Sequence, residues 1–194
     1  MTKKQKIEQI AKELFLKYGF KKVTVDEICK KAHVSRKTYY TLYENKNALV
    51  LYVLKEIVSN SIQEYKKIID SQGSFADKMK RSLELKYAFS KTLTMEFVAD
   101  IVDPGSVEIL EYWKIVIQES MVLLTNFLRE GQRTGEMNPE LNLNYVLWIF
   151  GKMSDILNAP EALLMFGNAE EMVRQVTQML VYGIMPVPIA KDKS

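Results

Sequence analysis

Apolar residues recur along most of the chain at the spacing of an α-helix. Over residues 4–18, for example, Ile7, Ala11, Leu14 and Phe15 fall on one stripe. The same pattern predicts helices over about 24–32, 35–43 and 46–70. No segment keeps the period-two alternation of a half-buried strand. The sequence therefore predicts an all-α protein.

Four or five more helices are expected beyond Gly73. One is predicted over about residues 75–100, and the next to open at Asp103-Pro104, with Asp as the N-cap and Pro at the first helical position. One bent helix, or a short helix and a long one, then reaches about Arg133. A strongly apolar helix over 143–157 and a last helix ending near Ile184 complete the prediction.

Cap residues near the N-terminus predict two helices joined by a short turn. Thr24 and Glu27 form a Thr-x-x-Glu capping box, and Ser35 is placed to cap the helix that follows. Residues 32–35 between the two helices give the turn length of a helix-turn-helix. On the second of them, Tyr39, Leu42 and Tyr43 are predicted to face inward.

The outward side chains of this short helix suit an anionic partner. Arg36 and Lys37 match the acceptors of guanine, and Thr41 can contact a base edge or a thymine methyl group. Thr38 and Tyr40 suit phosphate oxygens, as do the helix starts near Thr24 and Lys46. The residues predicted to bind DNA are Thr24, Ser35, Arg36, Lys37, Thr38, Tyr40, Thr41 and Lys46. The alternative is that these are solvated charges and packed tyrosines.

Composition narrows the class of protein. Of 194 residues, 47% are hydrophobic and 26% charged, as in ordinary globular domains, and a single Cys excludes a disulfide framework or a multi-thiolate metal site. No apolar run approaches the roughly 18 residues that span a bilayer, and no secretory signal opens the chain. We expect a cytoplasmic protein without metal, cofactor or membrane partner.

Charge is unevenly placed along the chain. Residues 1–50 hold 12 Lys and Arg against 5 Asp and Glu, a net charge of +7, whereas residues 51–194 hold 15 against 19, a net charge of −4. A basic head on a mildly acidic body favours contact with a polyanion through one end. A solvated basic surface without a partner is the alternative from charge alone.

Residues 7–50 resemble the DNA-binding domain of TetR-type transcriptional regulators. The matching positions are Ile10-Ala11, Leu14-Phe15, Gly19, Thr24-Val25, Ile28, Ala32, Val34-Ser35, Thr38, Tyr40, Tyr43, Lys46 and Leu49. The resemblance implies a three-helix helix-turn-helix domain over residues 1–48 and a helical effector-binding and dimerisation domain over residues 49–194. His33 stands where the family usually has Gly, so it must accept a turn conformation that Gly takes more easily.

The last two long helices are the expected dimer surface. Residues 145–150 are apolar all round the helix, and TetR-type regulators dimerise through the two corresponding helices. The predicted interface residues are Leu147, Trp148, Phe150, Gly151, Val176, Met179, Leu180 and Gly183. The alternative is that both helices simply form the core of the monomer.

The resemblance also implies a pocket for a small-molecule effector among the middle helices, which are rich in Met and aromatic residues. The candidate lining residues are Tyr87, Met95, Phe97, Trp113, Ile117 and Met121. Plain core packing is the alternative for most of them. An apolar or aromatic effector is expected.

Together these features predict a DNA-binding transcriptional regulator, in the family's usual mode a repressor, that binds a palindromic double-stranded operator as a homodimer and is released by its effector. An enzyme is not expected, because Cys29 and His33 lack a third ligand or an orienting carboxylate at a telling spacing. The remaining alternative is a helical protein-interaction module whose basic head does not read DNA sequence.

Overall fold

The computed structural model describes residues 1–90, 92–157, 165 and 169–184, and this part of the chain is helical with no strand. The all-α prediction is confirmed. The helices are α1 (Lys3–Tyr18), α2 (Val25–Ala32), α3 (Arg36–Leu42), α4 (Lys46–Ile69), α5 (Phe75–Ser90), α6 (Met95–Val102), α7 (Val107–Arg133), α8 (Leu143–Leu157) and α10 (Ala169–Ile184).

The chain divides into two compact units, each with its own core. The first unit comprises residues 1–64 and 88–118, and the second comprises residues 65–87 and 119–194. This division by packing is not the functional boundary at residues 48–49 expected from the sequence, which stays a prediction.

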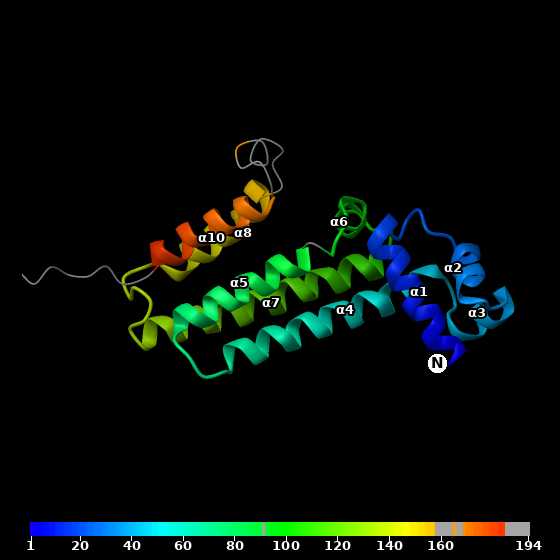
Figure 1. Cartoon of the computed structure of the whole chain (residues 1–194), viewed down its shortest axis with the longest axis horizontal. Coiled ribbons are helices and arrows are strands. Elements are labelled where there is room, and N and C mark those ends of the chain that lie inside the picture. The colour runs from blue at the N-terminus through cyan, green and yellow to red at the C-terminus, as the bar shows by residue number, and fades with distance from the viewer. Residues whose placement is uncertain (91, 158–164, 166–168, 185–194) are drawn as a thin grey trace, which may run out of the picture. The chain divides into compact units, whose positions relative to one another are not determined.

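Helices α1, α2 and α3 pack together at the N-terminal end of the first unit (blue in Figure 1). Thr2 caps α1 in a capping box with Gln5, and Thr24 caps α2 in the same way with Glu27. Their apolar stripes meet in one core, in which Ile7, Ile28 and Leu49 are fully buried. Side chains from the head and from the start of α4 therefore share a single hydrophobic interior.

The prediction of one helix over residues 75–100 is wrong, because α5 ends at Ser90 and α6 begins at Met95. Thr94 accounts for the new start. Its hydroxyl accepts a hydrogen bond from the N–H of Phe97 and donates one to the carbonyl of Leu16 on α1. The N-terminus of α6 is thus fixed by α1, a contact from 78 residues away in sequence.

The predicted helix start at Asp103-Pro104 is also wrong. Asp103 ends α6, with its N–H donating to the carbonyl of Ala99. Helix α7 starts at Val107 after Ser106, whose carbonyl accepts from the N–H of Leu110 and whose hydroxyl accepts from the N–H of Ile109. The carboxylate of Asp103 instead pairs with Lys21 at 2.9 Å. From Val107 to Arg133, α7 is a single helix.

The turn between α1 and α2 is tied to α6. The backbone N–H of Lys21 donates to the Asp100 carboxylate at 2.8 Å. One residue earlier, the ring of Phe20 packs edge-on against Phe97, with ring centroids 6.1 Å apart. Helix α6 therefore belongs to the same packed unit as the head.

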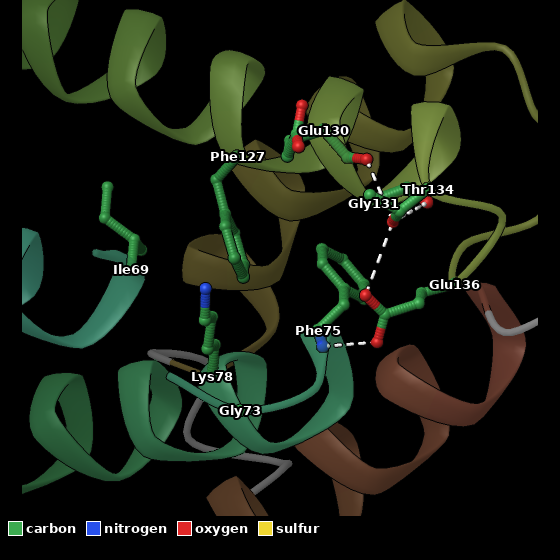
Figure 2. Close-up of a pocket in the computed structure, with 9 residues that line it drawn as sticks. All are labelled: Ile69, Gly73, Phe75, Lys78, Phe127, Glu130, Gly131, Thr134 and Glu136. Atoms are coloured by element: carbon green, nitrogen blue, oxygen red, sulfur yellow. Dashed lines mark hydrogen bonds between the residues drawn. The ribbon is translucent and has the colours of Figure 1, made fainter. Parts of the chain in front are cut away.

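In the second unit, the start of α5 packs against the end of α7. The ring of Phe75 stacks on Phe127 with centroids 4.8 Å apart. Gly131 makes this approach possible, because a Cβ built there would lie 2.6 Å from the Phe75 ring. Glu136 accepts a hydrogen bond from the Phe75 N–H at 2.7 Å, which fixes the first residue of the helix (Figure 2).

Gly131→Ala is expected to destabilise the protein by about 1–3 kcal/mol, because the new methyl group overpacks the Phe75 ring. Alanine otherwise stabilises a helix interior relative to glycine. Chemical denaturation at one fixed protein concentration measures the difference in unfolding free energy. The control is Gly131→Ala combined with Phe75→Leu, which should show a favourable coupling energy. A single variant as stable as the parent would contradict the packing described.

Candidate DNA-binding interface

A left-handed residue forms the turn between α2 and α3. His33 has φ 53° and ψ 47°, the one positive φ at a residue other than glycine in the described part of the chain. Its N–H donates back to the carbonyl of Lys30, and the N–H of Val34 donates to the carbonyl of Cys29. The conformation expected for His33 is confirmed, and it ends α2 abruptly enough to turn the chain into α3.

The inner face of α3 is fixed by tyrosines. Tyr39 is fully buried, Tyr43 is almost so, and Val34 packs against the same core. Burial raises the pKa of Tyr39 to about 12. Leu42 is 38% exposed, so its predicted inward position is wrong. It lies three residues from Tyr39 and one from Tyr43, at the edge of the buried stripe.

The outer face of α3 carries the residues predicted to meet DNA. Arg36, Lys37, Tyr40 and Thr41 are all exposed, and the aromatic ring of Tyr40 packs edge-on against Tyr39. Cations, a phenol and a hydroxyl thus project from a helix whose opposite face is locked in the core. A recognition helix requires this combination.

Several of the predicted hydroxyl groups already hold the helices in shape. Ser35 accepts the Thr38 N–H at 3.1 Å, and the two hydroxyls lie 3.0 Å apart. Thr24 accepts the Glu27 N–H, and Thr41 donates to the carbonyl of Lys37 at 2.8 Å. These four residues therefore shape the interface, whatever contacts they make with DNA.

Arg36 has a partner that the sequence reasoning missed. Its Nε lies 3.1 Å from Oδ1 of Asp26 on α2, and both side chains are well exposed. The nearby side chain of Tyr40 and then the charge of Asp26 raise the pKa of Arg36. The sequence did contain a signal for this pair, because the first turn of α2 holds an acidic residue and the first turn of α3 holds a cation. The turn between the two helices brings these residues together.

The ammonium of Lys46 lies inside the head. It donates to the carbonyls of Phe20 at 2.9 Å, Lys21 at 3.1 Å and Val23 at 3.0 Å. Burial lowers the pKa of Lys46, which is consistent with this part-buried position. The residue predicted to grip phosphate from the start of α4 therefore joins α4 to the turn between α1 and α2.

A buried polar pair links α1 to the end of α3. The hydroxyl of Tyr43 donates to Oε1 of Glu8 at 2.6 Å, and Glu8 is 8% exposed. Lys4 lies 3.6 Å from the same carboxylate oxygen and above the ring of Tyr52. Burial, followed by the hydrogen bond to Glu8, raises the pKa of Tyr43. The sequence reasoning took Tyr43 as apolar core and did not consider Glu8.

The predicted dimer residues divide by exposure. Leu147 and Phe150 pack partly into the core of the second unit, whereas Trp148 is 57% and Met179 67% exposed. Gly151 and Gly183 are exposed, and a Cβ at either would meet nothing within 4 Å. The side chains of Val176 and Leu180 lie outside the described part of the chain. Tyr145 stacks beside Trp148, with centroids 6.0 Å apart.

The predicted effector residues with described side chains differ in exposure. Phe97 is buried in the core of the first unit, and Trp113 packs against it. Ile117 is 51% exposed on α7, and Met121 is 37% exposed. The side chains of Tyr87 and Met95 lie outside the described part of the chain.

A pocket of about 110 Å³ lies elsewhere, at the start of α5 and the end of α7 (Figure 2). Ile69, Phe75 and Phe127 supply apolar walls, and Lys78 and Glu130 supply charges. None of the four predicted effector residues with described side chains, namely Phe97, Trp113, Ile117 and Met121, lines it.

Other kinds of site find no support in the described residues. They contain no group of three His, Cys, Asp or Glu residues placed to hold a metal ion. None of their helices is both long enough and apolar enough to cross a bilayer.

Residues 9–53 match the family model for bacterial regulatory proteins of the tetR family. This part of the chain is therefore a DNA-binding domain of the TetR type. The match covers most of α1, all of α2 and α3, and the start of α4, which are the elements of the basic head. The prediction of a regulator and not an enzyme is confirmed by these comparisons.

Two similar proteins are described as HTH-type transcriptional regulators. The chain is 22% identical over 141 residues to the uncharacterized HTH-type transcriptional regulator YhgD of Bacillus subtilis strain 168, and the alignment covers 72% of this chain and 74% of YhgD. It is 31% identical over 93 residues to the HTH-type transcriptional regulator SAB2452 of Staphylococcus aureus strain bovine RF122 / ET3-1, covering 46% and 50% of the two chains.

The whole fold resembles that of the transcriptional regulator FadR from Bacillus subtilis, solved in complex with stearoyl-CoA. The TM-score is 0.70, at 20% identity, over 93% of this chain and 99% of FadR. The similarity extends through both units, whereas the family model matches the N-terminal part only.

Lys46→Met is expected to destabilise the regulator by about 2 kcal/mol, because three backbone carbonyls lose a charged donor. Thermal and urea unfolding measure the loss. Lys22→Met, which removes an exposed charge from the adjoining turn, should be nearly neutral. Equal stability of the two variants would show that the Lys46 ammonium does not hold the turn in solution.

Proposed function

We propose that this regulator binds a palindromic DNA operator as a homodimer, with α3 of each protomer in the major groove. The observation that carries the proposal is the division of α3 into a face fixed by buried Tyr39 and a face that exposes Arg36, Lys37, Tyr40 and Thr41. Arg36 and Lys37 then contact guanine acceptors, and Tyr40 and the helix caps position the protein on phosphates.

The charge distribution supports DNA over a protein partner. The net charge of +7 lies within residues 1–50, which include all of α3. Several cations are held by partners within the protein, but Lys37 on α3, Lys30 and Lys31 at the end of α2, and Lys22 before α2 are exposed. A helical protein-interaction module would not need so basic a surface beside a recognition helix.

The dimer is proposed to form through α8 and α10. Trp148 and Tyr145 on α8 and Met179 and Tyr182 on α10 are large apolar or aromatic side chains that are more than half exposed. Exposure of this kind in a soluble protein indicates a contact surface. A two-fold dimer would place two copies of α3 about 34–36 Å apart, or a multiple of that spacing, on an operator with matching symmetry.

We propose that the protein represses transcription and that a small-molecule effector relieves this repression. Its proposed location is the cytoplasm. FadR, the structural neighbour, was solved with stearoyl-CoA bound. For the present regulator we propose an apolar or aromatic effector held in the helical body, because Met and aromatic residues are frequent there and adapt to varied apolar ligands. Effector binding would favour a spacing of the two heads that does not fit the operator.

Arg36→Ala is expected to weaken operator binding at least about tenfold, since one bidentate guanine contact in each half-site is lost. Lys37→Ala should weaken binding and reduce the salt dependence of affinity, and Tyr40→Phe should have a smaller effect than either. The operator is first selected from a random duplex pool, and affinity is then measured by fluorescence anisotropy over a range of salt concentrations.

The matched control is Lys66→Ala, which removes one exposed charge from the far end of α4. It should bind the operator as the parent protein does. Unchanged affinity of both Arg36→Ala and Lys37→Ala would reject α3 as the recognition helix. Failure of the parent protein to enrich any duplex, or a flat salt profile, would favour the protein-interaction module.

Trp148→Asp is expected to convert the dimer to monomers, because a charge replaces an exposed aromatic ring at the proposed interface. Multi-angle light scattering measures the mass of the particle. Val102→Asp is the control, since Val102 is 74% exposed on α6 and lies outside the proposed interface. A Trp148→Asp protein that remains dimeric would move the interface elsewhere.

A further inference from the structure

The first helix of the helix-turn-helix touches the arginine of the second. Asp26 lies in the first turn of α2, and Arg36 is the first residue of α3. Their contact joins Oδ1 of Asp26 to Nε of Arg36 at 3.1 Å. Both side chains are more than 60% exposed, so the pair lies on the surface proposed to meet DNA and not in the core.

The atoms used in this contact determine what the guanidinium has left to offer. A guanidinium carries five N–H donors in a planar fork, one of them on Nε. Because this contact is made at Nε, it does not use the edge formed by the two terminal nitrogens. Two donors on one edge match O6 and N7 of guanine. The contact thus leaves free an edge that recognises that base.

The same contact limits the motion of a long side chain. The Arg36 side chain on α3 is held by Asp26 on α2. Exposed ion pairs add little to folding stability. Their effect here is on binding, because a guanidinium already oriented loses less conformational freedom when it reaches the base.

The carboxylate would also affect binding to DNA that lacks the matching base. With α3 in the major groove, Asp26 would bring a negative charge toward the phosphates, and Arg36 would balance that charge as long as the pair persists. At a site without guanine, Arg36 would have to leave Asp26 to contact a phosphate. Loss of the ion pair would then offset part of the binding energy that the phosphate contact supplies. Neutral Asn at position 26 would release Arg36 to any phosphate and would remove the repulsion, which favours non-specific binding.

We propose that Asp26 is a specificity-determining residue, which holds Arg36 by Nε so that its terminal nitrogens face a guanine and which disfavours duplexes without that guanine. This inference rests on the proposed function, namely operator binding through α3. It adds a positioning residue on α2 that is not itself expected to contact a base.

The test compares Asp26→Asn with Glu44→Gln, which makes the same charge change at an exposed carboxyl group just beyond α3. Affinity is measured for the selected operator, for operators with each guanine replaced in turn, and for an unrelated duplex. Asp26→Asn should raise affinity for the unrelated duplex and lower discrimination at one guanine by at least about fivefold. Glu44→Gln should leave discrimination at that guanine unchanged.

A double-mutant cycle separates positioning from a general charge effect. In the Arg36→Ala background, Asp26→Asn should not change discrimination at the same guanine, because the side chain that it positions is absent. Circular dichroism checks that each variant keeps its helices.

Two results would overturn the inference. One is a uniform gain of affinity by Asp26→Asn and Glu44→Gln with discrimination unchanged, and the other is no effect of Asp26→Asn at all. If the parent protein selects no duplex, the proposed function fails, and the inference fails with it. If the parent selects an operator that needs Arg36 but not Asp26, the inference alone fails.

Discussion

Tertiary burial of Tyr39 is the constraint on which the head depends. Helix α3 has seven residues, far fewer than the roughly 12–15 that an isolated helix needs to be even marginally stable in water. Its shape and direction therefore come from the core to which Tyr39 belongs, with Ser35 satisfying the first turn. Everything proposed about base contacts follows from this, since the outer face has a defined direction only while the inner face is buried.

Features set by neighbouring residues could be predicted from the sequence. The capping box at Thr24, the cap at Ser35 and the start of α4 at Lys46 depend on contacts within three or four residues. The left-handed conformation of His33 could also be predicted, because the turn requires it of whichever residue stands there. Local geometry was enough to place the helix-turn-helix.

Features set by contacts between distant residues could not be predicted. The break between α5 and α6 lies in a stretch whose apolar spacing suits one helix, and the hydrogen bond from Thr94 to Leu16 on α1 accompanies it. Likewise, the charge of Lys46 suggested phosphate, whereas its three carbonyl partners lie 23 to 26 residues earlier. Residue type indicated which groups are chemically capable of binding DNA. Only the packed structure shows which of these groups are already bonded to partners within the protein.

The hydrogen bond between Tyr43 and Glu8 has a consequence for which packings the head can adopt. A purely apolar contact between α1 and the end of α3 would tolerate small slips, since one aliphatic neighbour is much like another. A slip that separates this phenol from its carboxylate would leave the phenol buried without a partner and the carboxylate with Lys4 alone, at a cost of roughly 1–3 kcal/mol. The pair contributes little net stability to the correct fold but penalises misaligned ones. It thereby selects a single alignment of the recognition helix from the compact arrangements that the same apolar residues would permit.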